Sequence, residues 1–82
     1  MGTYFFDVKN DGEGEVDQVG LNLDGPEQAR TEAVKALPDI ARDVLPDGHD
    51  RTIAVSVRDE TGRVFFRASL TLRCEWFPQH GS

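Results

Sequence analysis

Disulfide bonds cannot form within this chain, because its 82 residues include a single cysteine, Cys74. Small secreted domains usually rely on disulfides, since a short chain cannot bury a large core. We therefore expect a protein of the reducing cytoplasm. The sequence also lacks an apolar run near the roughly 20 residues of a membrane span. Its start, Met1–Asp7, lacks the basic and long apolar regions of a signal peptide, so we expect no association with a membrane.

Basic side chains are scarce: nine lysines and arginines stand against fifteen acidic residues, which gives a formal charge of −6. Residues 1–50 carry twelve acidic and four basic side chains, whereas residues 51–82 carry five arginines and three acidic side chains. An acidic protein is repelled by nucleic acid at long range. We therefore do not expect nucleic acid as the main partner, although the local excess of arginine keeps a weaker form of that hypothesis open.

Alternation of apolar and polar residues predicts four strands, over Thr3–Lys9, Val19–Leu23, Thr52–Arg58 and Arg63–Glu75. In the last strand, Cys74 and Trp76 are in phase with the apolar residues that face the core. Asn10–Asp17 is expected to be a loop. The last strand is long for a small domain, since its 13 residues span about 43 Å.

One helix is predicted between the second and third strands. Asp24 is expected to cap its first turn, and Pro26 suits that turn because its missing N–H is not needed there. Apolar residues then recur every three or four positions from Ala29 to Val44, and residues 45–48 end the helix. Pro38 removes one helical hydrogen bond, but the apolar stripe continues in phase across it. We therefore expect one kinked helix, with two helices that meet at Pro38 as the alternative.

The predicted fold is an α+β domain with the order β-β-α-β-β. Four mostly antiparallel strands form the sheet, and the single Pro-kinked helix packs on one face of it. With antiparallel neighbours throughout, the strands lie in the spatial order second, first, third, fourth. Residues 1–77 form this one domain, and residues 78–82 are expected to be a flexible tail.

No pattern in the sequence indicates a catalytic site, a metal site or a cofactor. The acidic residues between Asp11 and Asp17 do not follow the spacing of a calcium-binding loop, and such residues also suit a solvated hairpin. His49 and His80 are the only histidines, and with one cysteine they do not form a zinc motif. Cys74 is expected to be an inert core residue. We therefore expect a protein that is not an enzyme.

The outer face of the sheet is the best candidate for function. The alternation that sends Phe66 inward directs Phe65, Arg67, Ser69, Thr71 and Arg73 outward, and Phe5 joins them from the first strand. Three interpretations stay open. The face can be solvated, it can be an interface between copies of the chain, or it can bind single-stranded nucleic acid or another anion. In the third case the ligand would meet Arg58, Arg63, Arg67 and Arg73.

The end of the long strand adds Trp76 and Phe77, which extend past the predicted core. Tryptophan is a frequent anchor of protein interfaces, but these two side chains can also fold over the helix end. Our first hypothesis is a homodimer that forms through the last strand or the open face, and an unknown protein partner stays open beside it. Its candidate residues are Phe5, Phe65, Arg67, Thr71, Arg73 and Trp76. The binding of an anionic ligand is the alternative.

Five segments taken together carry a family resemblance: Tyr4–Val8, Ala36–Ala41, Leu45–Gly48, Val57–Gly62 and Leu70–Leu72. They include an N-terminal Tyr-Phe-Phe strand and a Leu-Pro-Asp motif in the helix. Across nearly the whole chain, this pattern resembles a domain of unknown function found in small bacterial proteins, mainly of alphaproteobacteria. The resemblance implies a bacterial cytoplasmic protein in which Pro38 is a recurrent and tolerated part of the helix. It implies no activity, cofactor or catalytic residue.

Overall fold

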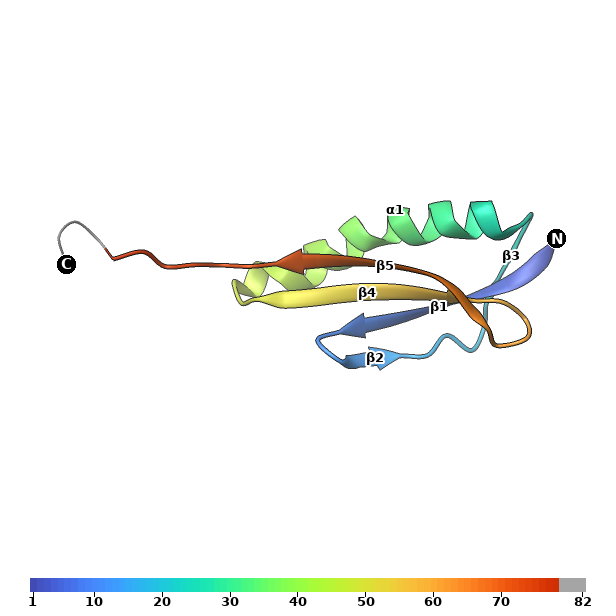
Figure 1. Ribbon diagram of the computed structural model, residues 1–82, viewed down its shortest axis with the longest axis horizontal. Coiled ribbons are helices and arrows are strands. Elements are labelled where there is room, and N and C mark those ends of the chain that lie inside the picture. The colour runs from blue at the N-terminus through green and yellow to red at the C-terminus, as the bar shows by residue number, and fades with distance from the viewer. Residues whose placement is uncertain (79–82) are drawn as a thin grey trace.

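The computed structural model describes residues 1–78 of the chain, apart from the side chain of Asp47. It confirms the α+β class, with one helix on one face of an antiparallel sheet (Figure 1). The chain order is β-β-β-α-β-β, one short strand more than the sequence predicted. The predicted flexible tail lies outside the described residues, except for Pro78. His80 lies outside them as well.

The strands have the bounds β1 (Gly2–Asn10), β2 (Glu13–Glu15), β3 (Leu21–Leu23), β4 (Arg51–Arg58) and β5 (Val64–Leu72). The long strands lie in the order β1-β4-β5, and the short strands β2 and β3 both pair with the other side of β1. Every pairing is antiparallel. Strand β3 corresponds to the predicted second strand, whose expected place beside β1 is confirmed.

The additional strand β2 arises from a tight hairpin. Asp11 and Gly12 both have positive φ, 54° and 89°. A two-residue Asp-Gly loop with this geometry matches the right-handed twist of the strands that it joins. The chain therefore turns back at once and pairs Asn10 with Glu13. The two glycines and four acidic side chains of residues 10–17 predict a loop instead, so this short strand is a correction.

Helix α1 (Pro26–Val44) is continuous across Pro38, which excludes the alternative of two helices. Pro38 is exposed, so water can reach the carbonyl group that has lost its donor. The expected cap at Asp24 is wrong. Gly25 is the N-cap residue, and the Gln28 side chain accepts a hydrogen bond of 2.8 Å from the N–H of Asp24. A short 3₁₀ helix, η1 (Leu45–Asp47), then leads to β4.

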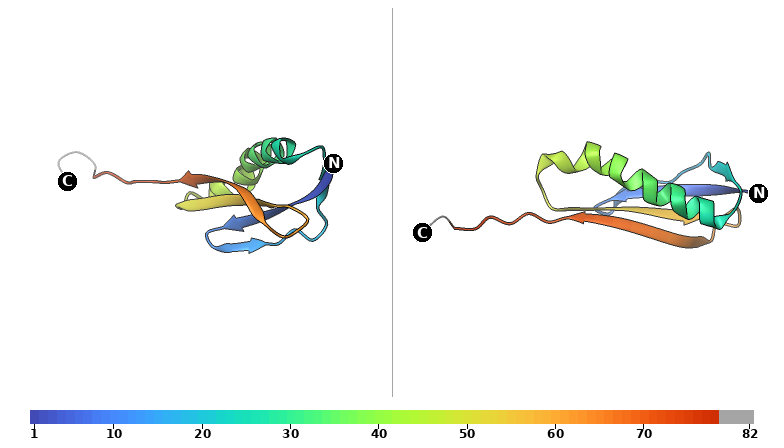
Figure 2. Two further views of the ribbon diagram at one scale, coloured as in Figure 1. Left: turned by 45° about the vertical axis from the view of Figure 1, so that its right-hand side comes forward. Right: turned by 90° about the horizontal axis from the view of Figure 1, so that it is seen from above.

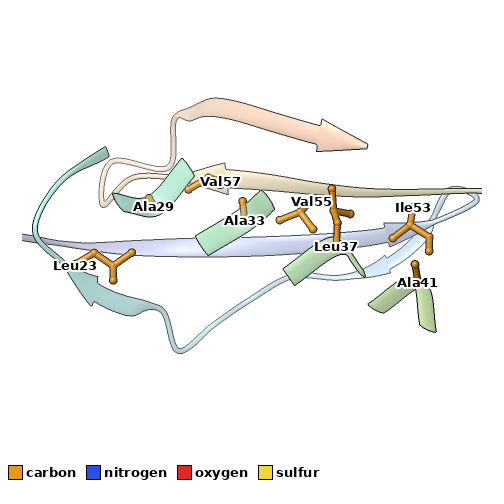
Figure 3. Packing of buried hydrophobic residues seen from close by; sticks show 8 residues of the cluster. All are labelled: Leu23, Ala29, Ala33, Leu37, Ala41, Ile53, Val55 and Val57. Carbon is orange, nitrogen blue, oxygen red and sulfur yellow. The ribbon is translucent and has the colours of Figure 1, made fainter. Parts of the chain in front are cut away.

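The core is thin, and on the helix side most of its residues are alanine. Helix α1 presents a stripe with a spacing of four residues, Ala29, Ala33, Leu37 and Ala41. Figure 3 shows this stripe facing Ile53, Val55 and Val57 of β4, with Leu23 at the β3 end. Because alanine has almost no side chain, the helix can approach the sheet closely. No helix of residues 1–78 covers the other face of the sheet.

None of the helices in the described part of the chain combines the length and the apolar character that a membrane crossing needs.

Candidate functional site: the β5 edge and the C-terminal arm

The two edges of the sheet differ in kind. On one side, β1 pairs with β3 at residues 2–4 and with β2 at residues 8–10, so this edge is divided into two short strands. On the other side, β5 is a continuous strand of nine residues, and it is the outermost strand (Figure 2). Short or interrupted edge strands discourage pairing with another chain, whereas a long free edge is a template for it.

Asp17 fills the gap between β2 and β3. Its carboxylate accepts hydrogen bonds from the backbone N–H groups of Phe6, Val19 and Gly20, at 3.0–3.2 Å. Phe6 lies between the two parts of β1 that β3 and β2 pair with, so no strand supplies an acceptor for its N–H on this side. A side chain therefore replaces the missing strand and satisfies the backbone of β1.

Arg58, the last residue of β4, is bonded to Asp17 and to Asp7. Its Nε and Nη2 atoms donate to the two carboxylate oxygens of Asp7 at 2.7 and 3.1 Å, and Nη2 also donates to the carbonyl oxygen of Asp17 at 2.8 Å. The guanidinium lies over the ring of Phe5, 4.8 Å from its centre. Such a bidentate contact fixes the orientation of arginine. Arg58 and Phe5, two of the predicted site residues, are thus brought together, but as parts of the fold.

The pKa directions agree with this geometry. The hydrogen bond from Arg58 holds the pKa of Asp7 below its ordinary value of 3.8, against the opposing effect of burial. Burial also tends to raise the pKa of Asp17, but the backbone N–H groups of Phe6, Val19 and Gly20 outweigh it, so the pKa of Asp17 is lowered. Both carboxylates are therefore held in their charged form.

A β-bulge redirects Phe65, so its predicted outward position is wrong. Val57 pairs with Phe66, and the next residue, Arg58, pairs with Val64, which leaves Phe65 without a partner. The extra residue reverses the alternation at this end of β5. Phe65 therefore packs against the core and meets the ring of Tyr4 edge to face, with 5.8 Å between the ring centres. Val64 takes the outward place and is 44% exposed.

The remaining predicted residues of β5 do lie on the outer face. Arg67 donates from Nε to the Ser56 hydroxyl at 2.9 Å, and the hydroxyl oxygens of Thr71 and Thr52 are 3.1 Å apart. Both contacts join β5 to β4 and leave the other side of β5 open. Arg63 is exposed just before the strand, in the turn that joins β4 to β5.

An extended arm, residues 73–78, continues the line of β5 beyond the body of the protein (Figure 1). The radius of gyration is 16.1 Å, whereas a compact domain of this length has about 12 Å. Trp76 is 96% exposed and Phe77 is 74% exposed, so neither side chain folds over the helix end. Arg73, a predicted site residue, is also exposed on this arm.

Two predictions fail at this arm. The predicted fourth strand ended at Glu75, but β5 ends at Leu72, because β4 begins at Arg51 and offers no partner farther on. Cys74 is exposed and is not a core residue. The arm still contacts the body through the backbone N–H of Cys74, which donates to Asp50 at 2.8 Å. The arm therefore has strand-like direction without a strand neighbour.

The free edge of β5 has a definite polarity. The N–H of Cys74 points toward the β4 side, where Asp50 lies. Because peptide groups alternate along an extended strand, even-numbered residues from 66 to 76 direct their N–H and C=O groups to that side. Odd-numbered residues, among them Arg67, Ser69 and Thr71, present theirs to the free edge. These groups are available to an additional strand.

A hollow of about 240 Å³ adjoins this edge on the helix side of the sheet. It is lined by Pro26, Glu27 and Arg30 of α1 and by Phe65 and Phe66 of β5. The Arg30 guanidinium lies 5.9 Å from the centre of the Phe66 ring. Sequence reasoning missed this hollow, because it depends on the bulge at Phe65 and on where the helix begins.

A metal site finds no support in the part of the chain that the structure describes. Within residues 1–78, no three His, Cys, Asp or Glu side chains gather closely enough to hold a metal ion. In the acidic segment, the Asp11 carboxylate accepts a hydrogen bond from the N–H of Thr52 at 2.9 Å, and Asp17 bonds as described above. Both carboxylates therefore accept hydrogen bonds from backbone N–H groups.

Comparison with known proteins gives a family whose function is unknown. A search of curated proteins and a search of solved structures each find no match. Residues 3–71 match a family described as a domain of unknown function, DUF6894. The match extends from β1 to the penultimate residue of β5, and it stops before the arm. Since it covers most of the chain, this protein belongs to the DUF6894 family.

Proposed function

We propose that this protein is a non-enzymatic interaction module that self-associates through the free edge of β5. The observation that carries the proposal is the contrast between the two edges. The edge at β1 is divided into two strands of three residues, and Asp17 bonds the backbone in the gap between them. Strand β5, by contrast, has nine residues and no strand on the side away from β4 in the described residues. Two copies that pair by β5 would join their sheets into one and protect both edges.

The exposed arm supports the same proposal. Trp76 and Phe77 are large apolar side chains on a segment that makes little contact with its own domain. Aromatic residues and arginine are the residue types enriched at the centres of interfaces. An arm that continues the pairing strand would carry these aromatic side chains onto the second copy.

Ser69 provides the test. Its N–H faces the free edge and is not needed for pairing with β4, so Ser69→Pro should retain the fold while it removes a donor from the edge. We expect native mass spectrometry and sedimentation to show a dimer for the unsubstituted protein and for the control Ser69→Ala. Ser69→Pro should be monomeric with an unchanged far-UV circular dichroism spectrum. A monomer at all concentrations for the unsubstituted protein would refute the proposal.

The alternative, an anionic ligand on the outer face, stays a prediction from the sequence. Arg58 already donates to Asp7 and to the Asp17 carbonyl, so it would have to leave these partners in order to bind phosphate. Arg63, Arg67 and Arg73 are exposed, but no contact between them defines a site. Titration with mixed-sequence RNA and DNA at low salt tests this alternative.

The bacterial and cytoplasmic setting belongs to the same proposal. It rests on the family resemblance and on the exposed thiol of Cys74. A reducing compartment would keep this thiol from forming disulfides between copies.

A further inference from the structure

We propose that the two copies pair β5 and the arm in one defined register, antiparallel across a two-fold axis at Thr71, and that Trp76 of each copy fills the hollow beside Phe66 of the other. This inference rests on the proposed self-association and specifies its geometry. In an antiparallel pair around Thr71, a residue that precedes Thr71 by a given number of positions lies opposite the residue of the second copy that follows Thr71 by the same number. The paired segment then runs from Phe66 to Trp76.

The helix side of this register is apolar throughout. Leu70 lies opposite Leu72 of the second copy, Ala68 lies opposite Cys74, and Phe66 lies opposite Trp76. Cross-strand apolar and aromatic pairs of this kind stabilise sheets. Leu70 and Trp76, which are 39% and 96% exposed in the single chain, would both become covered.

The outer side of this register is complementary in charge. Arg67 lies opposite Glu75 of the second copy, and by symmetry this pair occurs twice. Within the described residues, Arg67 uses its Nε atom on Ser56, and its terminal nitrogen atoms have no recorded partner. A carboxylate directly across the strand can occupy those atoms.

The neighbouring registers lose this match. An axis at Leu70 places Arg67 opposite Arg73, which sets like charges against each other at two points. An axis at Leu72 places Glu75 opposite Ser69 and moves Trp76 from Phe66 to Ala68, away from the hollow. Only the axis at Thr71 combines the charge pair with the aromatic pair among these three registers.

The hollow suits an indole ring. Phe65, Phe66 and Pro26 provide apolar walls, Arg30 can lie over the ring, and the Glu27 carboxylate offers an acceptor for the indole N–H. Phe66, which lines the hollow, belongs to the outermost strand, and this register brings Trp76 of the second copy opposite it. A side chain that is almost fully exposed in the single chain thus obtains a site.

Main-chain polarity is consistent with the same axis. The main-chain groups of odd-numbered residues face the free edge. Thr71 therefore forms a hydrogen-bonded pair with Thr71 of the second copy, Ser69 with its Arg73, and Arg67 with its Glu75. Five such pairs give about ten main-chain hydrogen bonds. Ala68 and Cys74 then form a non-hydrogen-bonded pair, in which the Cα atoms lie about 4.5 Å apart.

That spacing makes the natural cysteine a probe of the register. Disulfides form when the Cα atoms are about 4.4–6.8 Å apart. We expect Ala68→Cys to give an oxidised dimer linked between residues 68 and 74, identified by peptide mass spectrometry. Within one extended chain these residues are about 20 Å apart, so the bond must join two copies. The control Leu70→Cys and the unsubstituted protein should not cross-link.

Outcomes separate the register from self-association itself. A native dimer that cross-links through Leu70→Cys, or through Cys74 of the unsubstituted chain, would replace this register by a shifted one. A native dimer in which Ala68→Cys does not cross-link would also overturn it. If Ala68→Cys and the unsubstituted protein are both monomeric, the proposed function fails, and the register fails with it.

The fluorescence of Trp76 tests its docking separately, because it is the only tryptophan in the chain. We expect its emission to shift to shorter wavelength as the protein concentration rises through the range where the dimer forms. Ser69→Pro should keep the emission of an exposed indole at every concentration. Emission that does not change while the dimer forms would show that Trp76 stays in water and would overturn its placement in the hollow.

Discussion

At the scale of single residues, Asp17 and Arg58 show how polar side chains complete this small sheet. Asp17 accepts three backbone N–H groups, and Arg58 holds Asp7 and the Asp17 carbonyl together. The sequence placed Asp17 in an acidic loop and Arg58 on a ligand-binding face. Neither position was recognisable as structural, because the need for an acceptor arises only when β2 and β3 leave a gap along β1.

These carboxylates predict how stability depends on pH. The pKa values of Asp7 and Asp17 are lowered from 3.8 in the folded protein, so their contribution is complete above that value. As the pH falls below about 4, the unfolded chain binds protons first, and the free energy of unfolding decreases until the folded-state pKa values are passed. Urea denaturation at a series of pH values measures this decrease.

A variant identifies the source of the decrease. We expect Asp17→Asn to be less stable at neutral pH and to lose less stability between about pH 5 and pH 2. Glu13→Gln, which changes an exposed side chain of β2, is the matched control. Its free energy of unfolding should depend on pH as that of the unsubstituted protein does. If the free energy of unfolding falls equally with pH in Asp17→Asn and in the unsubstituted protein, Asp17 does not cause the acid sensitivity.

At the scale of elements, helix α1 and strand β5 show which sequence signals were sufficient. The Ala29, Ala33, Leu37 and Ala41 stripe continued through Pro38, and the helix does the same. Hydrophobic periodicity therefore outweighed the local cost of proline. In β5 the same kind of reasoning failed at Phe65, because a bulge changes the facing of every residue before it, and the bulge follows from pairing with β4.

Pro38 should limit the stability of the helix. Proline is about 3 kcal/mol less favourable than alanine inside a helix, and part of this cost is avoided because Pro38 faces water. We expect Pro38→Ala to raise the free energy of unfolding by about 1–3 kcal/mol, measured by urea denaturation. Pro26→Ala is the control, since proline fits the first turn, and it should give no gain. A Pro38→Ala protein no more stable than the original would contradict this account.

At the scale of the whole molecule, the body and the arm differ in burial, because the body holds the core and the side chains of the described arm are exposed. Among the described residues, the core of α1, β3 and β4 includes none after Leu72, and the family match ends at residue 71. The arm therefore adds little to the stability of the single chain. Its exposed aromatic side chains become favourable only if a second surface covers them.

Truncation after Leu72 tests this division. We expect the shortened protein to keep its circular dichroism spectrum and, at low concentration, its thermal midpoint, because the described part of the arm is exposed and the bond from Cys74 to Asp50 is a small loss. The dimer should weaken strongly, as measured by sedimentation equilibrium. Unfolding on truncation would assign the arm to the fold, and an equally stable dimer would remove the arm from the interface.

The sequence by itself determined the fold class, the three long strands and the continuous helix, because side-chain periodicity is a local property that each segment carries alone. It also placed Arg67 and Thr71 on the outer face. The Asp11-Gly12 pair is a hairpin-turn signal that pointed to β2, but the polar residues Glu13–Glu15 lack the apolar alternation of a strand. Only the tertiary structure decided that Phe65 turns inward, that Cys74 is exposed, and that Trp76 does not fold over the helix end. These features depend on which segments find neighbours, and that is settled by the whole sheet.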